Sequence, residues 1–182
     1  MIEKTLTTKT VFQGRLLKVQ VLEVKLDGGV RSRREIVRHP GAIAVVAQLP
    51  DKRFVFVRQY RKAVECSLLE IVAGCLEPRE NPDKCARREI KEETGYDVGS
   101  LKKLCVVALA PGYSSERLHV YFARLKASRG IATPDEDERI QVVCLTASAF
   151  EKMVRNGRIG DSKTLAGWLL YKTMVVPGRG KK

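Results

Sequence analysis

The sequence predicts an α/β protein. Along most of the chain, apolar and polar residues alternate with the period of a β-strand, and turn signals separate the alternating stretches. Residues 82–94 instead combine helix-start and helix-stop signals, and two more helical patterns close the chain. At 182 residues with 44% apolar content, the chain is long enough for one domain with a core and a small extension.

The first 38 residues predict a small antiparallel sheet. Residues 17–24 alternate loosely, residues 27–29 (Asp-Gly-Gly) are a turn signal, and residues 33–38 alternate again. A sheet of two or three strands is marginally stable in water by itself. We therefore expect residues 1–38 to form an extension that needs a packing partner.

Five further strands are predicted downstream. Residues 42–47 (AIAVVA) are continuously apolar, as expected for a strand that is covered on both faces. The other four expected strands are residues 53–59, 104–109, 118–125 and 140–145. Two helices are expected after them, one near residues 147–156 and one starting near Ser162. In the last helix we expect four core residues: Leu165, Trp168, Leu169 and Met174.

The helix over residues 82–94 is the most sharply delimited element. Asn81 can cap it by accepting a backbone N–H, and Pro82 suits the first helical position. Asp83 complements the positive end of the helix dipole, and Gly95 can take the left-handed conformation that ends a helix. One side of this helix, with Ala86, Ile90 and Thr94, is expected to pack on a sheet.

Three glutamates of this helix, Glu89, Glu92 and Glu93, fall on one adjacent arc. Their mutual repulsion costs a few tenths of a kcal/mol per i,i+4 pair, so a helix built only for stability would alternate the charges. A solvated charged face is the ordinary explanation of such a cluster. The alternative is a site for a divalent cation, because clustered carboxylates suit Mg²⁺ or Mn²⁺.

The surrounding segment decides between these explanations. Residues 74–96 match the pattern G-x5-E-x7-R-E-U-x-E-E-x-G-U, in which U is a bulky apolar residue. Its fixed positions are Gly74, Glu80, Arg88, Glu89, Glu92, Glu93 and Gly95. A chance match anywhere in the chain has a probability on the order of 10⁻⁷ at average residue frequencies. The pattern is the Nudix box, and the chain resembles a Nudix pyrophosphohydrolase.

The resemblance implies a fold and a metal site. The fold is an α/β/α sandwich with a mixed sheet, formed by residues 39–176. The small antiparallel sheet of residues 1–38 precedes it. A basic tail, residues 177–182, follows it and is expected to be disordered. Glu89 and Glu93 would ligate the metals, and Glu92 would bridge them or orient water. The backbone carbonyl of Ala73 would complete the site. Arg88 would orient the glutamates, and two or more Mg²⁺ or Mn²⁺ ions are expected.

Three features outside the box indicate a subfamily. Pro111 lies 15 residues beyond Tyr96 and opens the run PGYSSE. Residues 58–61 (RQYR), followed by residues 70–74 (EIVAG), form the second feature, and the acidic run 135–138 (DEDE) the third. Together they resemble the ADP-ribose pyrophosphatases, whose function would be hydrolysis of ADP-ribose to AMP and ribose 5-phosphate. Taken singly, Pro111-Gly112 is an ordinary turn signal and the acidic run an ordinary solvated loop.

The subfamily resemblance assigns roles to further residues. The substrate-contact candidates are Arg34, Glu35, Arg61, Pro111, Gly112 and Glu116. Arg61 would pair with the substrate diphosphate, which a guanidinium binds in a bidentate way. In the acidic loop, Glu138 would reach the metals and Glu136 would be the general base, although the two roles can be exchanged. A homodimer through the N-terminal sheet is also implied, with Arg34 or Glu35 reaching the partner's active site.

Other readings remain open. A Nudix hydrolase of another nucleoside diphosphate sugar, such as GDP-mannose, is the nearest alternative. A second alternative, suggested by the net charge of +13, is an RNA 5′-end processing or RNA-binding protein. The basic residues, however, are spread along the chain rather than clustered. A binder of ADP-ribose without turnover is a third, and the intact box argues against it. We therefore expect a small-molecule substrate and no nucleic-acid partner.

The remaining signals concern location. No run of 18 apolar residues exists, so no membrane partner is expected, and the first ten residues lack the apolar core of a signal peptide. The five cysteines are an odd number without CxxC spacing and predict reduced thiols in a cytoplasmic protein. With only two histidines, neither at metal-ligand spacing, a zinc site is not predicted.

Overall fold

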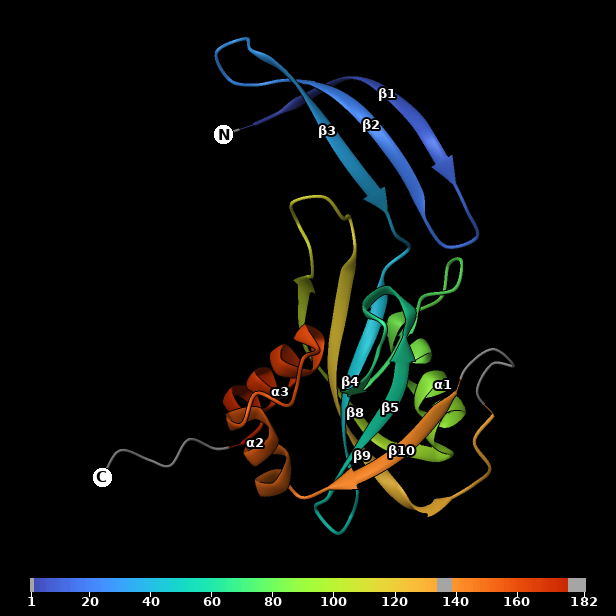
Figure 1. The fold of residues 1–182 in the computed structure, drawn as a ribbon. Coiled ribbons are helices and arrows are strands. Elements are labelled where there is room, and N and C mark those ends of the chain that lie inside the picture. Colours follow the sequence, from blue (N-terminus) through green and yellow to red (C-terminus); the bar gives the residue numbers. More distant parts are fainter. Residues whose placement is uncertain (1, 134–138, 177–182) are drawn as a thin grey trace.

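The computed structural model describes residues 2–133 and 139–176. Its first 38 residues contain a three-stranded antiparallel sheet of order β1-β2-β3, formed by β1 (Lys4–Gln13), β2 (Lys18–Lys25) and β3 (Arg31–Arg38). The turn between β2 and β3 contains Gly28 and Gly29, both with a φ of 88°, which glycine adopts without strain. This sheet projects away from the rest of the molecule (Figure 1).

A seven-stranded sheet forms the centre of the main domain. Its strands follow the order β10-β5-β4-β9-β8, with β6 paired to β5 and β7 paired to β4. The bounds are β4 (Ala42–Gln48), β5 (Phe54–Arg61), β6 (Cys66–Glu70), β7 (Val72–Cys75), β8 (Tyr96–Ala108), β9 (Arg117–Arg129) and β10 (Ile140–Leu145). Strands β4 and β9 are parallel and the other pairs are antiparallel, so the sheet is mixed, as predicted.

Helices cover both faces of this sheet. Helix α1 (Pro82–Thr94) lies on one face, and α2 (Ala147–Arg155) and α3 (Ser162–Met174) lie on the other (Figure 1). The side chains of β4 alternate between the two layers: Ala44 and Val46 belong to the α2/α3 core, whereas Ile43 and Val45 belong to the α1 core. The predicted α/β/α sandwich is therefore confirmed, including a β4 strand buried on both faces.

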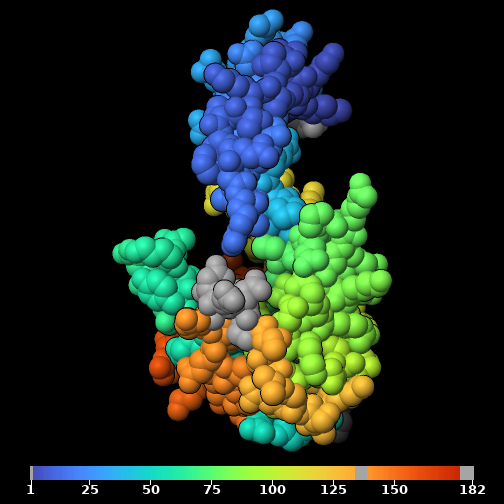
Figure 2. Space-filling view, turned by 90° about the vertical axis from the view of Figure 1, so that its right-hand side faces the viewer, coloured from blue at the N-terminus to red at the C-terminus, as the bar shows by residue number. Residues whose placement is uncertain are grey.

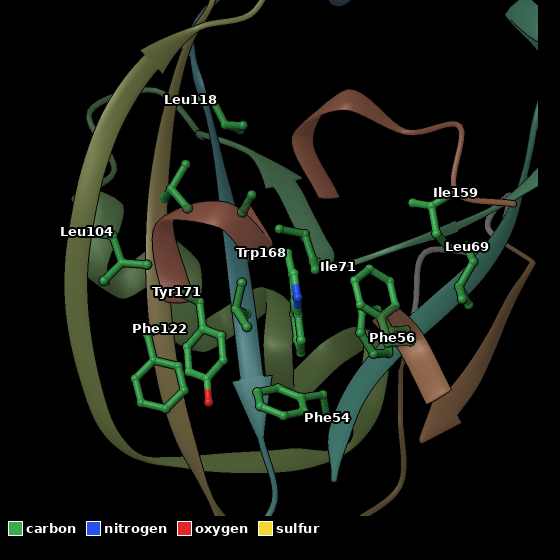
Figure 3. Packing of buried hydrophobic residues seen from close by; sticks show 14 of the residues in the cluster. Phe54, Phe56, Leu69, Ile71, Leu104, Leu118, Phe122, Ile159, Trp168 and Tyr171 are labelled. Carbon is green, nitrogen blue, oxygen red and sulfur yellow. The ribbon is translucent and has the colours of Figure 1, made fainter. Parts of the chain in front are cut away.

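The core under α2 and α3 is rich in aromatic residues. Trp168 lies between Phe54, Phe56 and Tyr171 (Figure 3). Its ring meets Phe54 edge to face with centroids 4.9 Å apart, and Phe56 stacks on Phe150 at 4.4 Å. These arrangements are favourable for aromatic pairs. They fix α3 against the sheet and so fix the position of its N-terminal end.

The prediction of the last helix was correct in position and wrong in its buried face. Of the four expected core residues only Trp168 is buried, at 6% exposure. The other three are exposed: Leu165, Leu169 and Met174. The stripe that faces the sheet is instead Thr164, Gly167, Trp168 and Tyr171, which follows helical spacing. Apolar residues surround the whole helix, so their pattern could not identify the packed side.

Two differences concern the strands. Strand β8 begins at Tyr96 rather than at residue 104, and its first half is polar because β8 is the last strand in the sheet order and its outer residues face solvent. Strands β6 and β7 were not predicted, since each has only four or five residues and β7 contains Gly74. Among the described residues, no helix is both long and apolar enough to cross a membrane.

Candidate active site

Helix α1 carries the residues of the Nudix box. It starts and ends where its sequence predicts: Asn81 Oδ1 accepts from the backbone N of Asp83 at 2.8 Å, and Gly95 ends the helix with a φ of 76°. Ala86 and Ile90 are fully buried in the core between α1 and the sheet. Because that side faces the sheet, the neighbouring arc of glutamates is directed along the sheet surface toward β7.

The three glutamates differ in burial. Glu93 is 4% exposed, the side chain of Glu89 is 14% exposed, and that of Glu92 is 37% exposed. A carboxylate as buried as Glu93 is costly unless a cation or hydrogen-bond donors compensate its charge. The structure thus brings the three residues to one place, and the ligand roles that the resemblance assigns to them stay predictions.

Arg88 connects the carboxylates of the box. Its Nη1 donates to Glu89 Oε1 at 2.8 Å and to Glu92 Oε2 at 2.9 Å, and its Nε and Nη2 each donate to Glu80 at 2.9 Å. The hydrogen bonds that Arg88 donates to Glu80 lower the pKa of Glu80 to about 2, and the same bonds are the main reason that the pKa of Arg88 is raised. Arg88 therefore keeps Glu80 ionised and fixes the orientation of three carboxylates, those of Glu80, Glu89 and Glu92.

The backbone of β7 lies directly against this cluster. A Cβ atom placed on Gly74 would lie 2.0 Å from Glu89 Oε1, so only glycine leaves room for that carboxylate. Ala73 is the preceding residue, and its carbonyl belongs to the same peptide segment. The close approach of Glu89 to this segment explains the glycine at the first position of the box.

The donor set fits a hard divalent cation. Its members are carboxylate oxygens from Glu89, Glu92 and Glu93 with the backbone carbonyl of Ala73 nearby, and oxygen ligands of this kind suit Mg²⁺ or Mn²⁺. Within residues 2–133 and 139–176, no three acidic, cysteine or histidine side chains already converge in ligating geometry. Arg88 donates to one oxygen of Glu89 and to one of Glu92. Glu136 and Glu138 lie outside the described residues.

Arg61 lies at the end of β5 and forms a fork with Glu70, the last residue of β6. Its Nε and Nη2 donate to the two oxygens of Glu70, each at 2.7 Å. Lys163 at the start of α3 donates to the same carboxylate. Lys163 was not among the residues predicted from the sequence, and Glu70 belonged only to a predicted motif. A charged residue inside the apolar run of residues 68–73 was the signal for a buried ion pair.

Residues 111–116 lie between β8 and β9 and contact the N-terminal sheet. The N of Val37 donates to the carbonyl of Tyr113 at 2.7 Å, and the N of Ser115 donates back to the carbonyl of Val37 at 2.9 Å. The N of His39 donates to Ser115 Oγ at 3.1 Å. Pro111, Gly112 and Glu116 therefore belong to a loop that is hydrogen-bonded to the end of β3.

Arg34 and Glu35 remain in the N-terminal sheet. Arg34 pairs with Glu3, the residue before β1, through Nε to Oε2 at 3.0 Å and Nη2 to Oε1 at 2.6 Å. Figure 2 shows a hollow bordered by this N-terminal part (blue), by the segment around β5 and β6 (teal) and by the segment of the Nudix box (green). Within one chain, neither Arg34 nor Glu35 is hydrogen-bonded to the described residues of the box.

Comparison with known proteins identifies the family of the chain. The family model described as NUDIX domain matches residues 37–166. The chain is 44% identical over 164 residues to a methanol dehydrogenase activator of Bacillus methanolicus, covering 90% of this chain and 89% of that protein. It is 38% identical over 166 residues to an ADP-ribose pyrophosphatase of Bacillus subtilis (strain 168), covering 89% and 88%.

Two further proteins match at lower identity. A GDP-mannose pyrophosphatase of Salmonella typhi is 37% identical over 145 residues, which covers 75% of each chain. A crystal structure described as an ADP compounds hydrolase superposes with a TM-score of 0.82 over 95% of this chain and 94% of that chain, at 23% identity, which is a likeness of fold. The family match spans most of the chain and contains the whole box, and so the chain belongs to the Nudix hydrolase family.

Proposed function

We propose that the chain hydrolyses ADP-ribose to AMP and ribose 5-phosphate with the help of divalent metal ions. The observation that carries this proposal is the position of Glu89, which lies against the backbone at Gly74 while Arg88 holds it and Glu92 in place. This arrangement supports binding of metal ions beside a diphosphate. The relative from Bacillus subtilis, whose name states ADP-ribose as substrate, supports the choice of substrate.

Each site residue has a proposed role in this reaction. Two or more Mg²⁺ or Mn²⁺ ions would be held by Glu89, Glu92, Glu93, the carbonyl of Ala73 and Glu138. When bound, these ions would neutralise charge on the diphosphate and on the leaving phosphate. Arg61 would pair with diphosphate oxygens. Glu136 would take the proton from the attacking water, with Glu138 as the alternative for that role. Pro111, Gly112 and Glu116 would line the substrate from the loop.

The function is tested by a substrate panel. Purified protein is incubated with ADP-ribose, GDP-mannose, diadenosine polyphosphates or 5′-triphosphate RNA, each with Mg²⁺ and with Mn²⁺, and the products are identified by chromatography. We expect the highest kcat/KM on ADP-ribose, with AMP and ribose 5-phosphate in equal amounts. A preference for GDP-mannose or RNA would replace the proposed substrate, while loss of all turnover without metal is expected in either case.

We also propose a homodimer through the N-terminal sheet. Strand β1 is exposed along its whole length, including Leu6, Val11 and Phe12, whose exposures are 39%, 53% and 57%. A second copy would cover this apolar surface and bring Arg34 or Glu35 to the other active site. Light scattering would report twice the chain mass. A variant without residues 1–38 that is a stable monomer with full activity would contradict the proposal.

A second candidate function follows from the relative at 44% identity, whose name states that it activates methanol dehydrogenase. The test adds the purified chain to a methanol dehydrogenase and measures the rate of alcohol oxidation. Glu93→Gln is the matched control, because it removes a proposed metal ligand and leaves the surface unchanged. Activation by the wild-type chain and not by Glu93→Gln would link activation to hydrolysis.

The cytoplasm is the proposed compartment. All five cysteines lie in the described residues, and none of them forms a disulfide. Reduced thiols support a reducing environment.

A further inference from the structure

Glu70 is a buried carboxylate to which the proposed reaction gives no role. It is 1% exposed, and burial favours the neutral acid. Burial is the largest influence on its pKa and raises it, but the hydrogen bonds from Arg61 and the charge of Lys163 together outweigh burial, so the pKa of Glu70 lies below its ordinary value. Glu70 is thus an anion held inside the protein by two cations.

The fork with Glu70 fixes the direction of Arg61. Two parallel N–H···O bonds restrict a long and otherwise mobile side chain. The side chain of Arg61 is 38% exposed, so it runs from the buried carboxylate to the surface. Its pKa is raised mainly by the hydrogen bond to Glu70, and the negative charge of Glu93 adds to the effect, so Arg61 and Glu93 lie within electrostatic reach of each other. In residues 2–133 and 139–176, the third nitrogen, Nη1, makes no hydrogen bond.

A second set of contacts ties Glu70 to α3. Lys163 Nζ donates to Glu70 and, at 3.0 Å, to Asp161 Oδ1. Asp161 also caps α3 by accepting from the N of Thr164 at 2.9 Å, and Thr164 Oγ1 accepts from the N of Ile71, also at 2.9 Å. The start of α3 is therefore hydrogen-bonded to the backbone of Ile71, which follows Glu70 and lies two residues before the proposed metal ligand Ala73.

We propose that Glu70 and Lys163 are positioning residues that hold Arg61 with its Nη1 directed at the substrate diphosphate. Because Lys163 shares the carboxylate of Glu70, that carboxylate does not by itself cancel the charge of Arg61. The inference rests on the proposed function, since it requires a diphosphate beside Arg61. It adds residues from β6 and from the C-terminal helix to the binding of the substrate.

A network that served stability alone would leave the KM of the folded enzyme unchanged, whereas a positioning role predicts a change in KM. If Arg61 contacts the diphosphate equally before and during the reaction, loosening it raises KM and leaves kcat nearly unchanged. We expect Glu70→Gln to raise the KM for ADP-ribose about tenfold, as for loss of one charged contact, with kcat within about threefold of wild type. In an Arg61→Ala background the same substitution should change KM no further, because the residue that it positions is absent.

The experiment compares four proteins by steady-state kinetics: wild type, Glu70→Gln, Arg61→Ala and the double variant. Glu151→Gln is the matched control, because Glu151 accepts from Lys172 of α3 at 2.8 Å in a more exposed ion pair. Its KM should equal that of wild type. An unchanged KM in Glu70→Gln, or an equal rise in KM with and without Arg61, would overturn the inference.

Lys163 provides the test if Glu70→Gln does not fold. Lys163→Met should raise KM several-fold, and Lys163→Arg should restore it. An unchanged KM in Lys163→Met would overturn the inference. All constants are measured with the diphosphate compound of the panel that the wild type hydrolyses best. Failure of the wild type on ADP-ribose then refutes the proposed substrate, whereas failure of the variants to change KM refutes only the positioning role.

Discussion

The lack of space at Gly74 allows a sharp test of the proposed metal site. In a Gly74→Ala variant, the added Cβ would lie 1.9 Å from Cδ and 2.0 Å from Oε1 of Glu89, where ordinary contact begins at 3.4 Å. The carboxylate of Glu89 must therefore move by more than 1 Å. The backbone at Gly74 is not left-handed, and the obstructing atoms are the end of a flexible side chain, so the fold should remain intact.

The expected result is a loss of rate without a loss of structure. A misplacement of about 1 Å at a catalytic group can cost about 10²-fold, so kcat at saturating Mg²⁺ should fall by about that factor. The Tm should stay close to that of Gly160→Ala, the matched control, whose added Cβ would only touch Leu68 at 3.7 Å. Steady-state kinetics and thermal unfolding measure the two quantities.

A double variant identifies the cause. If Gly74→Ala acts by moving Glu89, then Gly74→Ala combined with Glu89→Gln should be no slower than Glu89→Gln alone. A kcat near that of wild type in Gly74→Ala would refute the reasoning, because it would show that the position of Glu89 does not matter to the reaction.

Three other outcomes are expected. Glu93→Gln keeps the size of the side chain and should lower kcat by at least about 10²-fold with an unchanged circular dichroism spectrum; wild-type turnover would exclude a catalytic metal at Glu93. Glu136→Gln and Glu138→Gln should each lower kcat. Higher pH should partly rescue the variant that lacks the general base, and a higher metal concentration should partly rescue the variant that lacks a metal ligand. If both variants kept the wild-type rate, the acidic run would be an ordinary solvated loop. Glu80→Gln should destabilise the fold at pH 7 by about 1 kcal/mol after solvent screening; since the pKa of Glu80 falls to about 2 on folding, this difference in urea-unfolding free energy should shrink below about pH 4 and vanish near pH 2.

The sequence was most informative where local chemistry determines structure. The bounds of α1 follow from Asn81, Pro82 and Gly95, which act within one turn of the helix end, and the structure confirms them. The burial of β4 on both faces follows from its continuous apolar run. In α3, by contrast, apolar residues occur on all sides, so only tertiary packing selects Trp168 and leaves Leu169 exposed.

In the site, too, local sequence predicted some features, and tertiary packing determined the others. The glutamates of α1 could be placed on one arc because they share one helix. The contact between Glu89 and Gly74, and the group of Arg61, Glu70 and Lys163, join segments that only the fold brings together. No local pattern encodes the distance between residues 70 and 163, and this is why Lys163 was absent from the predicted site.

The hydrogen bonds between Val37 and residues 113 and 115 bear on protein engineering. A chimera that exchanges residues 1–38 for those of a relative would place a foreign strand against the original loop. The loop would then follow the new strand, and substrate preference could shift without any change in the Nudix box. Grafts of this kind should transfer residues 110–116 together with the sheet, and a library aimed at new nucleotide specificities would vary the two segments jointly.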